Sequence, residues 1–343
     1  MITIHTEKHR LRAAKTELYG GELVPPFECP ERVEFILGRL REVGLGEVRP
    51  PETQDDRTIR AIHHGDYLDF LASAWKDWVA AGMEGEAIPT VWPSRRMPRQ
   101  VVPPFIDGKL GWYALAGETS ISEGTWEAAR ASADVALTAA GLVSGGARTA
   151  FALCRPPGHH AAQDMYGGYC FLNNAAIAAE AMRDAGAAQV AILDVDFHHG
   201  NGTQAIFYDR SDVFFASLHG DPLEAFPHYL GGADEIGEGA GEGFNANYPL
   251  PRGTDWAPWS TAMEDALHRI AGFGAEALVI SLGVDTFKED PISFFRLESG
   301  EFTRMGERIA AAGLPTLFVM EGGYAVAEIG INTVNVLTGF EGA

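Results

Sequence analysis

The sequence predicts an α/β protein built on a mostly parallel β-sheet with helices on both faces. Apolar runs rich in β-forming residues alternate along the chain with amphipathic helical patterns. The runs are almost continuously apolar, which is typical of parallel strands buried on both faces. The candidate strands span residues 2–6, 149–154, 190–197, 213–219, 277–285 and 315–323. Helical patterns lie between them, for example at residues 125–145, 173–186 and 259–274.

A single domain over residues 1–343 is expected, because the chain contains no internal repeat and no low-complexity linker. The least regular stretch is a proline-rich segment at about 84–118. We expect a long loop insertion there, and long loops in compact domains are often functional.

Composition narrows the function classes. The net charge of −21 argues against a nucleic-acid partner and favours cationic ones. Because only five of the 26 basic residues are lysine, the acidity also fits a halotolerant protein. No apolar run is long enough to cross a membrane, and the polar N-terminus does not resemble a signal peptide. With three cysteines and no CxxC spacing, we expect reduced thiols and a cytoplasmic protein.

Costly polar residues follow four of the candidate strands. RPPGHH follows residues 149–154, HHGNG follows 190–197, Asp285 closes 277–285, and EGGY ends 315–323. The carboxyl ends of parallel strands meet in one crevice, so these groups are expected to converge. Strand alternation would also direct Asp194, Asp196 and His198 to one side.

A metal site explains this concentration of charge. Asp196, His198 and Asp285 would supply two oxygen ligands and one nitrogen ligand, leaving positions open for water and substrate. Three protein ligands are typical of catalytic Zn²⁺, although carboxylate-rich sites also accept Fe²⁺ or Co²⁺. Any one of these residues alone would more often be structural.

The chain contains two adjacent histidine pairs in different contexts. His159 and His160 follow a Pro-Pro-Gly turn that leaves a strand towards the predicted metal ligands. His63 and His64 follow a helical pattern without acidic neighbours at metal spacing, so a structural role is predicted for them.

Five motifs in order, GHHA, GGYCFLNN, DVDFHHGNGT, SLGVDTF and EGGY, resemble those of the histone deacetylase superfamily. The resemblance covers roughly residues 1–340, and TELYGGELVPPFE resembles most the bacterial acetylpolyamine branch. It implies an arginase–deacetylase fold with a central eight-stranded sheet. It also implies zinc-dependent amide hydrolysis that releases acetate.

The resemblance implies roles at individual positions. Asp196, His198 and Asp285 match metal ligands; His160 matches the general base and His159 its electrostatic partner; and Tyr324 matches the donor to the tetrahedral intermediate. Asp194 matches the carboxylate that orients His159. The matching structural potassium site comprises Asp194, Asp196, His198, Ser217 and the Leu218 carbonyl. Independently, amide hydrolysis needs a neutral base and a donor for the developing oxyanion.

The substrate tunnel is also implied by the resemblance, with Gly168, Tyr169 and Phe226 as its walls. In the polyamine branch the insertion packs on a second subunit and narrows the entrance, so a homodimer is expected. Glu118 is our first candidate to meet the distal ammonium of a substrate, and Asp107 the second. The alternative is that both are ordinary solvated acids.

One position departs from part of the family. HHGNG stands where some members have HHGDG, so Asn201 occupies the place of a carboxylate beside the second histidine. Because asparagine carries no charge, it should not raise the pKa of His160 as aspartate would.

Four functions are compatible with these sequence features. The leading hypothesis is a hydrolase acting on small, cationic acetylated amines such as acetylpolyamines. The alternative is a deacetylase of acetyl-lysine in proteins. An arginase-like ureohydrolase would need a further carboxylate where Gly200 and Asn201 stand. A non-enzymatic polyamine-binding protein would not need the intact set of ligands and bases.

Overall fold

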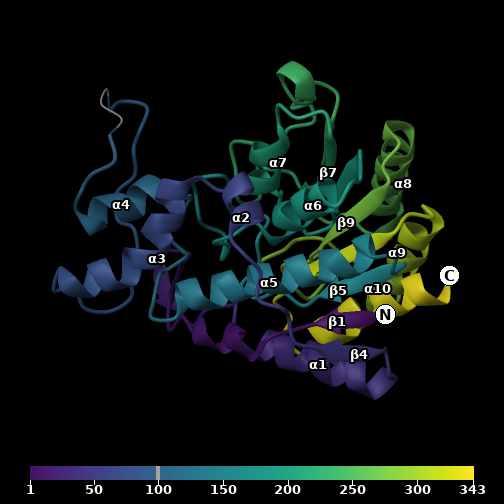
Figure 1. The fold of residues 1–343 in the computed structure, drawn as a ribbon, viewed down its shortest axis with the longest axis horizontal. Helices are drawn as coiled ribbons and strands as arrows, with labels where there is room; N and C mark the ends of the chain where they lie inside the picture. Colours follow the sequence, from purple (N-terminus) through teal and green to yellow (C-terminus); the bar gives the residue numbers. More distant parts are fainter. Residues whose placement is uncertain (98–100) are drawn as a thin grey trace.

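The computed structural model describes residues 1–97 and 101–343 and shows an eight-stranded sheet with helices on both faces (Figure 1). The strand order is β4-β1-β5-β10-β9-β6-β7-β8, and every pairing in this sheet is parallel. The predicted parallel α/β fold is confirmed. The strands are β1 (Ile2–Ile4), β4 (Glu47–Arg49), β5 (Thr149–Ala152), β6 (Val190–Asp194), β7 (Val213–Gly220), β8 (Asn245–Leu250), β9 (Ala277–Leu282) and β10 (Thr316–Met320).

The central strands are buried on both faces of the sheet, which is why these strands are mostly apolar. In β6, Val190 and Ile192 belong to one hydrophobic core, and Ala191 and Leu193 to the other. The first core includes helices α2 (Arg57–Ile62), α3 (Gly65–Ala80), α5 (Thr125–Ser144) and α6 (Asn174–Asp184). The second includes α1 (Glu31–Val43), α8 (Trp256–Phe273), α9 (Ser299–Ala311) and α10 (Ile329–Gly342).

Five of the six predicted strands end earlier than predicted at their carboxyl ends, whereas β7 ends one residue later. Residues 190–197 were expected to form one strand, but β6 ends at Asp194. Beyond it, Asp194 Oδ1 accepts the Asp196 N–H at 3.1 Å, and Asp196 Oδ1 accepts the His198 N–H at 2.8 Å. Turns built by the aspartate side chains, and not strand pleating, therefore determine the directions of Asp196 and His198.

Four strands were not predicted from the sequence. The strands are the sheet-edge strands β4 and β8, and the hairpin of β2 (Glu17–Tyr19) and β3 (Glu22–Val24) adds a separate small sheet. β4 is exposed throughout, and β8 contains Pro249, which an edge strand tolerates. Neither therefore has the apolar signature of a central strand.

The predicted loop at 84–118 is partly helical. Helix α4 (Ile106–Tyr113) lies within it and packs Ile106, Leu110 and Tyr113 into the core. Residues 98–100 of this insertion lie outside the described residues. Figure 1 shows α3 and α4 at the end of the molecule opposite the chain termini. No helix in the described part of the chain is both long and apolar enough to cross a membrane.

Candidate active site

A cavity of about 570 Å³ opens at the carboxyl ends of the strands, as the strand-end argument predicted. His160, His198 and Tyr324 lie in its wall, contributed by segments after β5, β6 and β10. The wall also contains the predicted tunnel residues Gly168, Tyr169 and Phe226.

The predicted metal ligands form a compact buried cluster. Asp196, His198 and Asp285 offer ligand atoms that all lie within 4.8 Å of one another. His198 Nδ1 is 2.9 Å from Asp285 Oδ2 and 3.3 Å from Asp196 Oδ1. The peptide N–H groups of Phe197 and Gly322 donate to the outer oxygens of Asp285 and Asp196, at 2.7 and 2.8 Å. Backbone donors thus orient both carboxylates.

The electrostatics of this cluster fit a divalent cation. Burial and the adjacent charge of Asp196 raise the pKa of Asp285 well above its usual range. Burial lowers the pKa of His198, but hydrogen bonds and charges from Asp196 and Asp285 outweigh this effect and raise it to about 10. Two buried carboxylates around one imidazole are costly unless a cation lies among them. The donor set of two carboxylates and one imidazole suits Zn²⁺, Fe²⁺ or Co²⁺.

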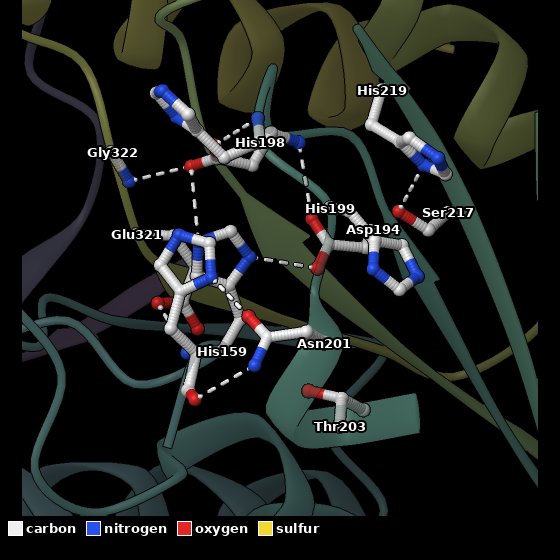
Figure 2. A network of polar contacts seen from close by, with 12 residues as sticks. His159, Asp194, His198, His199, Asn201, Thr203, Ser217, His219, Glu321 and Gly322 are labelled. Carbon is white, nitrogen blue, oxygen red and sulfur yellow. Dashed lines mark hydrogen bonds and ion pairs between the residues drawn. The ribbon is translucent and has the colours of Figure 1, made fainter. Parts of the chain in front are cut away.

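His159 is buried beside two carboxylates. Its Nδ1 is 2.9 Å from Asp194 Oδ2, and Figure 2 shows these two side chains pointing toward each other. Burial lowers the pKa of His159, but Asp194 and Asp196 outweigh burial and raise it to about 10. His159 is therefore suited to carry a positive charge behind the cavity wall.

His160 differs from His159 in both exposure and charge. It reaches the cavity, and its Nδ1 lies 2.6 Å from Asn201 Oδ1. The Asn201 amide donates to the His160 carbonyl at 3.3 Å, which turns Oδ1 toward the ring. His160 Nδ1 then carries the proton, and the Nε2 lone pair remains available to accept one. Burial, with the charges of His159 and His198, lowers the pKa of His160 well below its usual value.

A glycine makes room for His160. Gly168 has a φ of +55°, and a Cβ atom there would lie 2.2 Å from His160 Cδ2. Only glycine fits both this conformation and this contact.

Asn201→Asp should shift the acid limb of the pH–rate profile to higher pH. A carboxylate at the Asn201 position would stabilise protonated His160 and raise its pKa. The base would then be lost at a higher pH, so we expect the limb to move by about one unit or more. The measurement is kcat/KM from pH 5 to 9. An unmoved limb would show that the uncharged amide does not set the pKa of the base.

Tyr324 faces the metal-type cluster from the loop after β10. A Cβ built on Gly322 would lie 2.6 Å from Asp196 Oδ2, 2.8 Å from Asp285 Oδ2 and 3.2 Å from the Tyr324 hydroxyl. The hydroxyl and both carboxylates therefore lie close together beside the backbone of Gly322. Glycine is required at position 322 because the carboxylates pack directly against its backbone.

A buried network that sequence reasoning missed holds this loop. Arg32 donates to the carbonyls of Glu321 and Gly323 at 2.5 and 2.8 Å, and its guanidinium lies 5.1 Å from the Tyr324 ring centre. Glu28 pairs with both Arg32 and Arg155, at 3.1 and 2.7 Å. Glu28 belongs to the TELYGGELVPPFE motif, which was the available signal.

Two further acids hold backbone in the site. Asp290 Oδ2 accepts the Tyr324 N–H at 2.7 Å. Glu321 Oε2 accepts the N–H groups of Gly158 and His159, at 2.6 and 3.2 Å. Burial raises the pKa of Glu321 to about 7. In the sequence, the glutamate of the EGGY motif was the signal that could have identified Glu321.

Two acids, Glu118 and Glu17, line the substrate cavity, and Asp107 does not. Glu118 lines the cavity, but its Oε1 already accepts the Gly168 N–H at 2.6 Å. Glu17, which was not anticipated, also lines the cavity and accepts the Tyr169 hydroxyl at 3.0 Å. Burial raises the pKa of Glu17 to about 7. Asp107 lies on α4 and is not among the residues that line the cavity within one chain.

Three of the five residues predicted to hold potassium lie on the adjacent strands β6 and β7. Asp194 pairs in register with Ser217, and Leu218 follows on β7. All three are buried. Ser217 Oγ is 2.9 Å from His219 Nδ1 (Figure 2).

In the other histidine pair, His63 is structural, as expected. His63 Nδ1 lies 2.8 Å from the Ala162 carbonyl, and Nε2 accepts the Asn173 N–H at 2.9 Å. Both ring nitrogens therefore have partners. His63 thus links the backbone of Ala162, directly after the GHHA segment, to the backbone of Asn173.

A parallel α/β sheet, a buried carboxylate–histidine cluster at its carboxyl edge and a neutral histidine beside it define the class of metal-dependent hydrolases. The sequence matches a model of the histone deacetylase domain over residues 26–340. The protein belongs to the histone deacetylase family, whose members are metal-dependent deacetylases.

Comparisons with individual proteins agree with this family assignment. The chain is 59% identical to the acetylpolyamine amidohydrolase of Mycoplana ramosa over 343 residues, covering 100% of both proteins. It is 56% identical to acetylpolyamine amidohydrolase 2 of Pseudomonas aeruginosa, over 100% of this chain and 99% of that protein. The crystal structure of acetylpolyamine aminohydrolase from Burkholderia pseudomallei has a TM-score of 0.94 at 39% identity, covering 99% of this chain and 98% of that one. The expected arginase–deacetylase fold is confirmed.

Proposed function

We propose that this protein hydrolyses the amide of acetylated polyamines and similar small acetylated amines, releasing acetate and the free amine. The observation that carries the proposal is a cavity with a metal-type cluster, a neutral histidine and a tyrosine at one end, and Glu17 and Glu118 in its wall. Similarity along the whole chain to proteins named acetylpolyamine amidohydrolase supports the same substrate class.

In this proposal Asp196, His198 and Asp285 hold the metal. When bound, a Zn²⁺ ion there polarises the amide carbonyl and lowers the pKa of a water molecule. His160 Nε2 accepts the proton of the attacking water and returns one to the leaving amine. Asp194 orients His159, whose positive charge favours the neutral form of His160. The Tyr324 hydroxyl donates to the carbonyl oxygen as negative charge develops on it.

The substrate's acyl end would pass between Gly168, Tyr169 and Phe226. Its distal ammonium would meet the acidic wall of Glu17 and Glu118, where partial burial strengthens a charge-assisted contact. The net charge of −21 would also raise the local concentration of cationic substrates.

Three further assignments belong to this proposal. Zn²⁺ is the proposed metal, with Fe²⁺ or Co²⁺ as alternatives. Structural K⁺ is proposed between β6 and β7, near Asp194 and Ser217. A homodimer is proposed in which the 84–118 insertion meets the second subunit, and Asp107 would reach a substrate only in that arrangement.

A hydrolysis panel tests the proposed function. The zinc-loaded protein would be given N-acetylputrescine, N-acetylcadaverine, acetylspermidine and an acetyl-lysine peptide. We expect kcat/KM for at least one acetylpolyamine to exceed that for the peptide by roughly tenfold or more, since a flexible cation can use the acidic wall. A preference for the peptide would favour the protein-deacetylase alternative, and no hydrolysis of any amide would overturn the proposal.

Glu118→Gln tests the acidic wall. Glutamine keeps an acceptor for the Gly168 N–H but removes the charge. We expect kcat/KM for acetylpolyamines to fall roughly tenfold, the effect of losing one charge-assisted contact. An uncharged acetylated amine of equal length should be barely affected.

The matched control is Glu123→Gln, an exposed acid outside the cavity wall. It should change neither substrate. Equal losses on the charged and uncharged substrates in Glu118→Gln would show that Glu118 only holds the Gly168 loop.

A further inference from the structure

A second cluster of metal-ligand residues lies near the N-terminus, outside the active-site cavity. His5 follows β1, and Glu7 and His9 lie on the short 3-10 helix η1 (Glu7–Leu11). Their ligand atoms all lie within 4.8 Å of one another, the same separation limit that the active-site cluster meets. None of the three lines the active-site cavity.

The two histidines are buried without hydrogen-bond partners. His5 is 7% exposed and His9 is 1% exposed, and none of their four ring nitrogens has a hydrogen-bond partner in the described structure. Buried polar groups without partners need an explanation, and a bound ion is one that fits imidazole nitrogens. His63 provides the contrast, since both of its buried ring nitrogens are satisfied.

Carboxylates approach both rings from the solvent side. His5 Nε2 is 3.5 Å from Glu7 Oε1, and His9 Nε2 is 3.8 Å from Glu34 Oε1 on α1. The Glu7 and Glu34 side chains are 74% and 43% exposed, so they can close on an ion that enters from solvent.

The two arginines near the cluster do not prevent a cation from binding. Arg10 bridges Glu7 and Glu34 at 2.9 and 2.6 Å, but its side chain is 53% exposed and can withdraw. Arg155 donates to the His9 carbonyl, and its charge is already paired with Glu28. Burial lowers the pKa of His5, and it lowers the pKa of His9 to about 4, so both rings are neutral and keep lone pairs.

We propose that His5, Glu7 and His9, with Glu34 as a fourth ligand, form a second binding site for a divalent transition metal of the zinc class. Two imidazoles with carboxylates are a donor set that Zn²⁺ accepts in tetrahedral geometry. Ligand atoms around tetrahedral zinc lie about 3.4 Å apart, which the cluster reaches by side-chain movements of about 1 Å. The ion would tie η1 to α1 and give one nitrogen of each buried ring a partner.

Zinc stoichiometry tests the site. The full-length protein would be saturated with Zn²⁺, gel-filtered and analysed by mass spectrometry of the metal. We expect about two equivalents in the wild type and about one in Asp285→Asn, which disables only the active-site cluster. His5→Gln should also retain about one, and the double variant almost none.

Glu7→Gln and Glu34→Gln test the site without changing a buried residue, because both side chains are exposed. Each should weaken zinc binding at the second site by roughly tenfold or more, measured by calorimetry in the Asp285→Asn background. In that background zinc should also raise the melting temperature, because it binds only the folded state. Glu42→Gln, exposed on the same helix as Glu34, and His268→Gln, an exposed histidine, are the matched controls and should change nothing.

One outcome would overturn the proposal. Zinc content that falls to zero in Asp285→Asn alone, with no change of binding in His5→Gln or Glu7→Gln, would show that the active site is the sole zinc site. Zinc binding is measured separately in the active-site variant and in the second-site variants. Loss of catalysis therefore cannot be mistaken for loss of the second site.

Discussion

Asp285→Asn should remove one equivalent of metal and lower deacetylation by about 10³-fold or more. The substitution keeps an oxygen that can accept the Phe197 N–H, so the loop geometry is retained. It removes one of the two carboxylate charges that a divalent ion needs. A bound metal supplies several kcal/mol of charge stabilisation in such sites, and 1.36 kcal/mol corresponds to a factor of ten. Metal analysis and kcat/KM on an acetylpolyamine would be measured together.

The wild type and a surface variant complete this test. Chelation should inactivate the wild type, and added Zn²⁺ should restore its activity but not that of Asp285→Asn. Asp196→Ala should behave like Asp285→Asn. Asp209→Asn, an exposed acid outside the cavity wall, should leave metal content and rate unchanged. Full activity in a metal-free preparation would overturn the mechanism.

Tyr324→Phe should lower kcat by ~10²-fold or more while KM changes little. The ring would still pack below Arg32, and the cluster of Asp196, His198 and Asp285 would be untouched. Only the donor to the developing oxyanion is lost, and that interaction strengthens in the transition state. Steady-state kinetics on the best acetylpolyamine, with metal content measured in parallel, would check the result.

Tyr248→Phe is the matched control, because its hydroxyl donates to Asp265 away from the cavity. It should leave both kinetic constants unchanged. His160→Ala should be at least as damaging as Tyr324→Phe, since the base is lost. If Tyr324→Phe mainly raised KM, the hydroxyl would hold the substrate and not the transition state.

Burial explains which parts of the fold could be predicted from the sequence. The central strands were recognisable because both of their faces are covered, which demands continuous apolar runs. The edge strands β4 and β8 meet no such demand, and their pairing depends on neighbours that are distant in sequence. Helix α4 was missed because the proline-rich residues before it suggested an irregular chain throughout the insertion.

The candidate site shows the same division. Asp196, His198 and Asp285 could be identified because ionisable groups at the ends of apolar strands need a strong reason to be there. Glu28 and Arg32 were not identified, since their burial depends on the approach of the loop before Tyr324. Asp107 was chosen from its position along the chain, but it does not line the cavity within one subunit.

The strand order has a consequence for how the site comes into being. β10 is the last strand of the chain, yet it lies between β5 and β9 in the middle of the sheet. During synthesis, the segments with His159, His198 and Asp285 all emerge before the strand that joins their two halves of the sheet. Pairings of such high sequence separation form slowly. The nascent chain therefore has no complete catalytic centre until β10 and Tyr324, which follows it, have been synthesised and the strand has paired.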